Sequence, residues 1–164
     1  MRLFKNILLA LFIVFILIQF IRPAPNTSGQ VSPADISKAV IVPDSVADIF
    51  KSSCYDCHSN NTRYPWYVNM QPVGWMMARH VNTGKGNLNL NEFAAYSQRK
   101  QANKLKAIAA SIRDGSMPLA SYTILHKDAK LNQHQKDLII NWAIHAKDSV
   151  EIKNKHIKHL DIPV

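Results

Sequence analysis

Cys54-Tyr55-Asp56-Cys57-His58 is the stretch around which the rest of this sequence is best understood. Its two cysteines are the only cysteines among the 164 residues, and they stand three positions apart. On a helical turn this spacing places both thiols on the same side, and a histidine follows at once. One short segment therefore presents three groups that can hold a cofactor or a metal.

Several kinds of site use such a cysteine pair. A thioredoxin-like redox motif is typical of a βαβ context, which this sequence lacks. A structural zinc site usually needs a second pair of ligands, and the sequence offers no further cysteine. A cysteine pair followed directly by histidine is typical of covalent haem attachment, in which the thiols bond the vinyl groups and the histidine ligates the iron. The motif therefore predicts one haem c, bound through Cys54, Cys57 and His58.

Helical periodicity dominates the sequence on both sides of this motif, and strand signals are nearly absent. Ahead of it, Val46, Ile49 and Phe50 stand at helical spacing, with Asp44 as the expected N-cap. The chain is therefore expected to be all-α, with one folded domain over residues 41–149 and a basic polar tail over residues 150–164. Further helices are expected over 73–81, from the capping box Asn89-Leu90-Asn91-Glu92 to about 97, over 100–113 up to Gly115, and from the cap Asn132 to about 146.

The N-terminus is strongly apolar. Arg2 and Lys5 accompany a run from Leu3 to Ile21 that is nearly long enough to cross a bilayer, so residues 1–21 predict a transmembrane anchor or a signal sequence. Residues 22–40 are rich in Pro, Ser, Asn and Thr and are expected to form a flexible tether. We expect a single-pass protein of a bacterial inner membrane with its haem domain on the periplasmic side.

The residues from about Val46 to Trp142 resemble the small bacterial haem-binding-domain family, which is itself similar to class I cytochromes c. The resemblance implies a small cytochrome c-like helical domain packed around one haem, and it implies haem binding more firmly than any particular reaction. Besides the cysteine motif, it rests on Tyr64-Pro65-Trp66-Tyr67, Pro72-Val73-Gly74-Trp75, Leu88-Asn89, Met117-Pro118, Tyr122, His126 and Trp142.

The second iron ligand is the more open question. Gly115-Ser116-Met117-Pro118-Leu119 resembles the cytochrome c loop that supplies a methionine, because Pro118 cannot continue a helix and holds Met117 on rigid backbone. We therefore expect His58 and Met117 as the iron ligands. Five other residues are alternatives, the last two of them for bis-histidine ligation: Met70, Met76, Met77, His80 and His126.

The other parts of the haem environment are less determined by the pattern. Four aromatic residues are candidates for the walls of the haem pocket or for ordinary core positions: Trp66, Tyr67, Trp75 and Trp142. Arg63, Arg79 and Tyr64 are candidates for contacts with the haem propionates, without a preference among them.

The formal net charge is +9 at pH 7. A nucleic-acid partner is not expected, since the domain is expected to be exported and no recognition motif is present. An acidic redox partner or anionic lipid headgroups suit this charge better. A methionine opposite histidine favours electron transfer. The alternative is a sensor or peroxidase-like enzyme with an open sixth iron position and His80 or His126 nearby.

Overall fold

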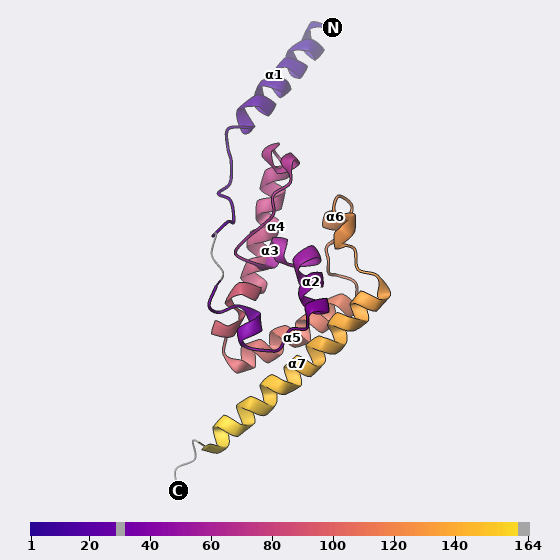
Figure 1. The fold of residues 1–164 in the computed structure, drawn as a ribbon. Coiled ribbons are helices and arrows are strands. Elements are labelled where there is room, and N and C mark those ends of the chain that lie inside the picture. Colours follow the sequence, from indigo (N-terminus) through magenta and orange to yellow (C-terminus); the bar gives the residue numbers. More distant parts are fainter. Residues whose placement is uncertain (29–31, 161–164) are drawn as a thin grey trace.

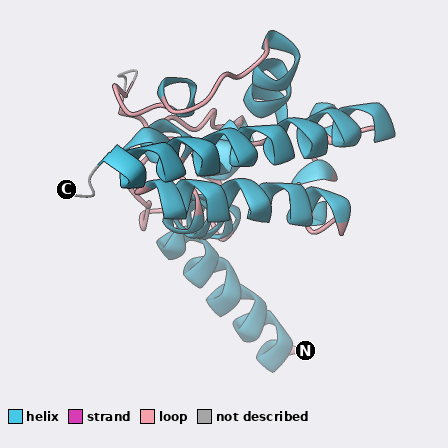
Figure 2. Cartoon of the chain, turned by 90° about the horizontal axis from the view of Figure 1, so that it is seen from below, coloured by secondary structure: helices cyan, strands magenta, loops and turns pink. Residues whose placement is uncertain are grey.

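The structure is a computed structural model that describes residues 1–28 and 32–160, with side chains as far as Lys153. The described residues form helices and loops and no strand, so the all-α expectation is confirmed (Figures 1 and 2). The α-helices are α1 (Arg2–Ile18), α2 (Asp44–Ser53), α3 (Tyr55–His58), α4 (Val73–Asn87), α5 (Gln98–Arg113), α6 (Ala120–Thr123) and α7 (Gln133–Leu160). Short 3-10 helices are η1 (Ile36–Lys38), η2 (Trp66–Asn69), η3 (Leu90–Ala95) and η4 (Lys127–Ala129).

The longest packing interface joins α5 and α7. Leu105 and Ala109 of α5 and Ile139 and Ala143 of α7 are fully or almost fully buried there. Their helical spacing gives each helix one apolar side, and burial of these sides is the main favourable term for a pair of amphipathic helices. The α5–α7 pair forms the base of the domain (Figure 1).

Helix α2 lies on this base and carries the cysteine motif at its end. The Phe50 ring meets the Trp142 ring edge-on, with centroids 5.2 Å apart, and the Trp142 Nε1 donates to the Ile41 carbonyl. Because Phe50 is anchored on α7, the next turn of chain, α3, begins at a fixed position above α5. Helix α3 in turn packs against α4.

Two helix ends agree with the sequence signals. At the start of α7, the Gln135 backbone N–H donates to the Asn132 side chain and the Asn132 N–H to the Gln135 side chain, a reciprocal cap. At the end of α5, Gly115 has a φ of 75°, a left-handed conformation that glycine adopts without strain.

Other helix boundaries differ from the expectations. Asp44 is the first residue of α2 and makes no side-chain cap, since Pro43 stands at the N-cap. The Asn89 side chain does cap a helix, but that helix is the 3-10 helix η3. Helix α4 continues through its glycines to Asn87, because it packs closely on α3, and α7 continues to Leu160. Residues 161–164 of the expected tail lie outside the described residues.

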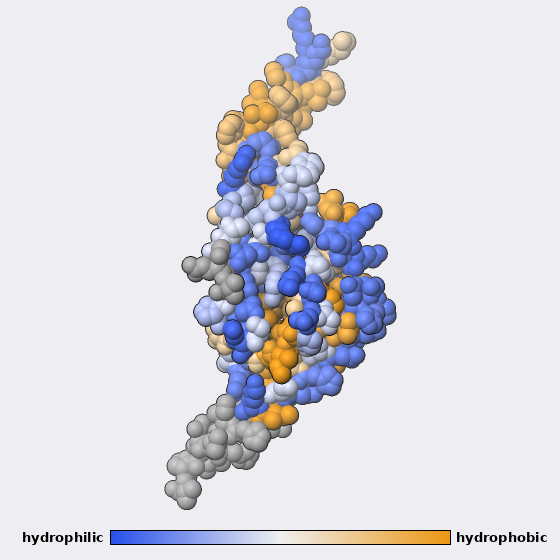
Figure 3. Space-filling view, viewed as in Figure 1, coloured by the Kyte–Doolittle hydropathy of each residue, from blue (hydrophilic) through white to orange (hydrophobic). Residues whose placement is uncertain are grey.

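The N-terminal segment also differs from the expectation. Of the helices within residues 1–28 and 32–160, none combines the length and the apolar character that crossing a membrane requires. The structure thus does not support the transmembrane helix expected over Leu3–Ile21. Helix α1 ends at Ile18, and the Gln19 side chain accepts a hydrogen bond from the Gln71 N–H and donates one to its carbonyl. The apolar side chains of α1 are exposed, as Figure 3 shows.

The segment expected as a tether makes contacts with the domain on both sides of the undescribed residues 29–31. The Asn26 side chain donates to the Ser59 carbonyl and to the Thr62 hydroxyl, and its backbone N–H donates to the Tyr64 hydroxyl. Ile36 belongs to the buried core. These contacts place parts of residues 22–40 against the loop that follows the cysteine motif.

Candidate functional site

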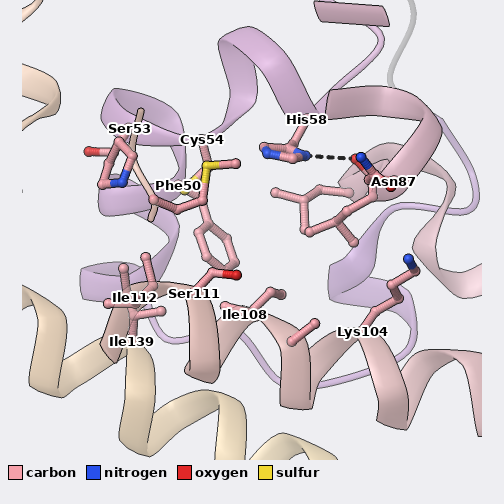
Figure 4. A pocket seen from close by; sticks show the side chains of 15 residues that line it. Phe50, Ser53, Cys54, His58, Asn87, Lys104, Ile108, Ser111, Ile112 and Ile139 are labelled. Carbon is pink, nitrogen blue, oxygen red and sulfur yellow. Dashed lines mark hydrogen bonds between the residues drawn. The ribbon is translucent and has the colours of Figure 1, made fainter. Parts of the chain in front are cut away.

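A cavity of about 310 Å³ opens between the α2–α3 segment and the side of α5 (Figure 4). Cys54 and His58 line it from the α2–α3 segment, and Met117 and Pro118 line it from the turn after α5. Most of the remaining surface is apolar and includes Phe50, Ile108 and Ile139. The lining residues are Phe50, Ser53, Cys54, His58, Asn87, Leu88, Leu90, Lys104, Ala107, Ile108, Ser111, Ile112, Met117, Pro118 and Ile139.

The His58 ring is held in one orientation. Its Nδ1 lies 2.9 Å from the Leu88 carbonyl oxygen, an interaction drawn as the dashed line in Figure 4. A carbonyl can only accept, so Nδ1 carries the proton and Nε2 keeps a free lone pair. An orienting hydrogen bond of this kind is what a metal-ligating histidine normally has on its second nitrogen. His58 is thus prepared to bind a metal through Nε2.

The Leu88 carbonyl is itself positioned by its neighbours. Asn89 is buried, and its side chain donates to the Asn60 Oδ1 at 2.7 Å, while the Asn60 Nδ2 donates to Glu92 at 2.6 Å. This polar network connects the residue after Leu88 with the loop after His58. This network fixes the distance between the His58 ring and the Leu88 carbonyl from both sides. In the sequence the network is visible only as several asparagines.

The two cysteines carry free thiols. Cys54 lines the cavity, whereas Cys57 does not, although it lies one helical turn further on. Burial, with a smaller contribution from Cys57, raises the pKa of the Cys54 thiol to about 12. Burial, with a smaller contribution from Asp56, raises the pKa of Cys57 to about 11. Both groups are therefore neutral thiols at physiological pH. Neutral thiols are compatible with an apolar ligand in the cavity.

Met117 lies on the same cavity, which brings it together with His58 and Cys54. The turn that carries it is held by the Met117 N–H, which donates to the Ser111 carbonyl, and by the Ser116 N–H, which donates to Asp114. None of the five alternative ligands lines the cavity. Met70 and Met76 are about half exposed, and Met77 is buried in another cluster.

The two remaining histidine candidates lie in a separate small hollow with Tyr67 and Tyr122. There the His126 ring stacks on Tyr122, with centroids 4.1 Å apart, and the Tyr67 hydroxyl lies 3.1 Å from the His126 Nε2. His80 lines the same hollow. The structure therefore places both histidines away from His58, on the opposite side of α3.

The aromatic residues considered as pocket walls do not line the cavity either. Trp66 is 76% exposed, Trp142 packs in the core against Phe50, and Trp75 donates through Nε1 to the Ile21 carbonyl. Phe50 is the aromatic side chain on the cavity. Aromatic composition alone could not make this distinction, because core and pocket positions call for the same residue types.

Asp56, between the two cysteines, is a structural residue that the sequence reasoning did not single out. Its carboxylate is buried and accepts hydrogen bonds from the Tyr122 hydroxyl at 2.5 Å and from the Arg63 backbone and guanidinium. Burial and the bond to Asp56 raise the pKa of Tyr122, and the Asp56 bond raises that of Arg63. The signal in the sequence that pointed to this contact was Tyr122, which is one of the residues that carry the family resemblance.

The lining residues suit a haem group. The cavity is largely apolar, and its lining includes an imidazole nitrogen, a thioether sulfur and a thiol that does not belong to a disulfide. These are the donors that haem iron and haem vinyl groups take. Among the described residues there is no group of three or more His, Cys, Asp or Glu side chains that could hold a metal ion by themselves.

Comparison with known proteins agrees with this geometry. A family model described as a haem-binding domain matches residues 13–145. No curated protein and no solved structure matches the chain. The family match covers most of the 164 residues, including every residue of the cavity. The chain therefore belongs to the haem-binding domain family.

Proposed function

We propose that this protein binds one haem covalently through Cys54 and Cys57 and carries electrons, with His58 and Met117 as the iron ligands. The observation that supports this most strongly is the presence of His58, Cys54 and Met117 on one apolar cavity. The bound haem would supply an iron that changes between the ferrous and ferric states. The chain's own contribution is to hold that iron between an imidazole and a thioether.

The composition of the cavity favours electron transfer over peroxide chemistry. A peroxidase-like site needs an acid–base group beside the open iron position. The lining residues include neither a carboxylate nor a histidine other than His58. His80 and His126 line the separate hollow on the other side of α3. An apolar site in which the protein supplies both iron ligands excludes water and limits reorganisation on electron transfer.

Covalent attachment is the first point to test. The protein is co-expressed with a cytochrome c maturation system and run on a denaturing gel that is stained for haem. The wild type is expected to stain, and the Cys54→Ala/Cys57→Ala double variant is not. A wild type that matures without colour, or one that holds zinc, would contradict the proposal at its base.

The sixth ligand is tested with carbon monoxide. The ferrous wild type is expected not to bind it readily, because Met117 occupies the position, whereas Met117→Ala opens the site and binds it. Met76→Ala serves as the matched control, since Met76 is 48% exposed and lies away from the cavity. If the ferrous wild type already binds carbon monoxide, the function is sensing or catalysis instead of electron transfer.

We further propose that the N-terminal segment directs export and holds the protein at the periplasmic face of a bacterial inner membrane, near its redox partner. Helix α1 supports this, because its Leu, Ile, Phe and Val side chains are exposed and favour an apolar environment. Cell fractionation with alkaline extraction tests it. The full chain is expected in the membrane fraction. A variant in which a cleavable export signal replaces residues 1–21 is expected as soluble periplasmic haem protein, and a full chain found among cytoplasmic proteins would refute the proposal.

A further inference from the structure

The two ends of the cavity differ in chemistry. Figure 4 shows Cys54 at one end and Lys104 at the other, with His58 between them along the upper wall. Asn87 stands at the Lys104 end as well. The middle of the cavity is lined by Phe50 and Ile108. A flat ligand that fills this space meets a thiol at one edge and a cation with an amide at the other.

The cationic end continues into a second hollow of about 440 Å³. Lys104 and Ala107 line both hollows, so the two are neighbours along α5. Arg99 and Lys100 line the second hollow from the first turn of that helix. Between Gln98 and Arg113 the sequence has five Lys or Arg residues and no carboxylate. The outer end of the cavity is therefore electropositive.

Lys104 is available for a ligand. No carboxylate pairs with Lys104 among the described side chains, in contrast to Lys51, Arg63 and Lys147, which all form ion pairs. Figure 4 shows the Lys104 Nζ group at the same end of the cavity as Asn87. A cation beside an apolar cavity is stabilised most when a ligand in the cavity places an anionic group next to it.

Haem has this polarity. Its vinyl groups lie along one edge, and its two propionate carboxylates lie along the opposite edge. We propose that Lys104 and Asn87 form the propionate subsite, with Lys104 paired to one carboxylate and the Arg99–Lys100 end of the second hollow facing the other. The proposal rests on the proposed haem attachment and adds the orientation of the group to it: thioether edge at Cys54, carboxylate edge at α5.

The residues considered from sequence for this role lie elsewhere. The Arg63 guanidinium is bound to Asp56, behind α3. The Tyr64 hydroxyl accepts from the Asn26 N–H. Arg79 is exposed on α4 and does not line the cavity. Lys104 is the cation that lines it, and sequence spacing could not distinguish Lys104 from Lys100 or Lys106.

The pairing has a measurable consequence. A positive charge beside a propionate offsets its negative charge, and this favours the ferrous haem, which carries one positive charge less at the iron. Removal of the Lys104 charge therefore lowers the midpoint potential. Lys106 on the same helix is exposed and lines neither hollow, so water and salt screen its charge from the haem.

The experiment compares holoprotein variants by spectroelectrochemistry. Lys104→Gln is expected to lower the midpoint potential, Lys104→Glu to lower it further, and Lys104→Arg to leave it close to wild type. The matched pair Lys106→Gln and Lys106→Glu is expected to give shifts about three times smaller or less, by screening. Resonance Raman spectra supply the direct readout: the propionate bending bands shift in Lys104→Gln and not in Lys106→Gln.

The outcomes separate the two proposals. If Lys104 and Lys106 variants shift the potential equally and leave the propionate bands unchanged, the subsite is refuted while haem attachment stands. If no variant and no wild-type protein stains for haem, the proposed function itself fails. Lys104 is only partly buried, so its variants are expected to fold, and circular dichroism checks this directly.

Discussion

The two sides of the Cys54–His58 segment differ sharply. On one side Cys54 and His58 lie on an apolar cavity of about 310 Å³. On the other side Asp56 is 5% exposed, and its carboxylate is satisfied by Tyr122 and Arg63. Five consecutive residues therefore contribute to the wall of an apolar cavity on one side and to a hydrogen-bonded protein contact on the other.

This difference shows how one short helix serves two purposes. The polar side fixes α3 to α6 and to the loop at Arg63, and it needs no cofactor to do so. The cavity side contributes little to stability until something fills it, because an empty apolar cavity lacks the contacts that a packed core makes. The stability of the domain should then depend on haem through the cavity side of the Cys54–His58 segment only.

The largest effect is expected from leaving the cavity side unfilled. The Cys54→Ala/Cys57→Ala variant and haem-free wild type are both expected to lose stability on the order of 5 kcal/mol relative to the holoprotein, from the cost of a cavity of this size. Urea unfolding followed by circular dichroism measures the loss. If the haem-free and haem-bound proteins unfold at the same urea concentration, the two sides do not differ in the way described.

The polar side is tested by Asp56→Ala in the holoprotein. The change leaves the buried Tyr122 hydroxyl without its acceptor and breaks the Arg63 pair, and we expect a loss of about 3 kcal/mol. Asp48→Ala is the matched control. Asp48 is exposed and pairs only with the exposed Lys51, so its loss should stay within about 0.5 kcal/mol. Equal losses of stability for the two variants would show that the buried contacts of Asp56 stabilise the domain no more than an exposed ion pair does.

A third test concerns the contact that holds the segment in place. A methyl group on Gly84 of α4 would lie 2.5 Å from the Cys57 carbonyl oxygen, whereas one on Gly86 would meet nothing within 4 Å. Gly84→Ala is expected to lower stability by about 2 kcal/mol and to reduce the yield of haem-bound protein. Gly86→Ala is expected to raise stability by about 0.5 kcal/mol through helix propensity. Thermal unfolding together with the haem-to-protein absorbance ratio tests both variants.

The same glycine shows where reasoning from sequence reached its limit. Asn82 to Gly86 has the composition of a helix stop, yet α4 continues to Asn87, because Gly84 allows a backbone approach that only tertiary packing reveals. Likewise, Tyr122 and Asp56 are 66 positions apart, and no local pattern connects them. Local signals did succeed where the cause is local, as at Gly115 and at the Asn132 cap.

The candidate site divides in the same way. The cysteine spacing and the methionine before Pro118 are short patterns, and they led to three residues that the structure brings to one cavity: Cys54, His58 and Met117. The cavity's other features depend on which helix faces it. Lys104 and the Leu88 carbonyl come from segments 30 or more positions from His58, and the aromatic residues that composition favoured lie in the core or at the surface.

The smallest expected effect concerns pH and is measured as the difference between wild type and Tyr122→Phe. Burial and the hydrogen bond to Asp56 raise the pKa of Tyr122 above its usual value near 10. A raised pKa in the folded state gives a stabilising contribution that is complete below pH 10 and declines as pH rises above it, because the unfolded chain loses its proton first. In the proposed holoprotein the cysteines would be thioethers without a titratable proton, and every other titratable group is common to wild type and Tyr122→Phe, so the comparison of the two proteins isolates Tyr122. Tyr122→Phe should cost about 1 kcal/mol at pH 8. Between pH 8 and 11 wild type should lose about 1.4 kcal/mol more than the variant, so the advantage of wild type disappears by pH 11. Unfolding free energies at pH 8, 10 and 11 measure it, and a constant difference would show that Asp56 does not hold the Tyr122 proton.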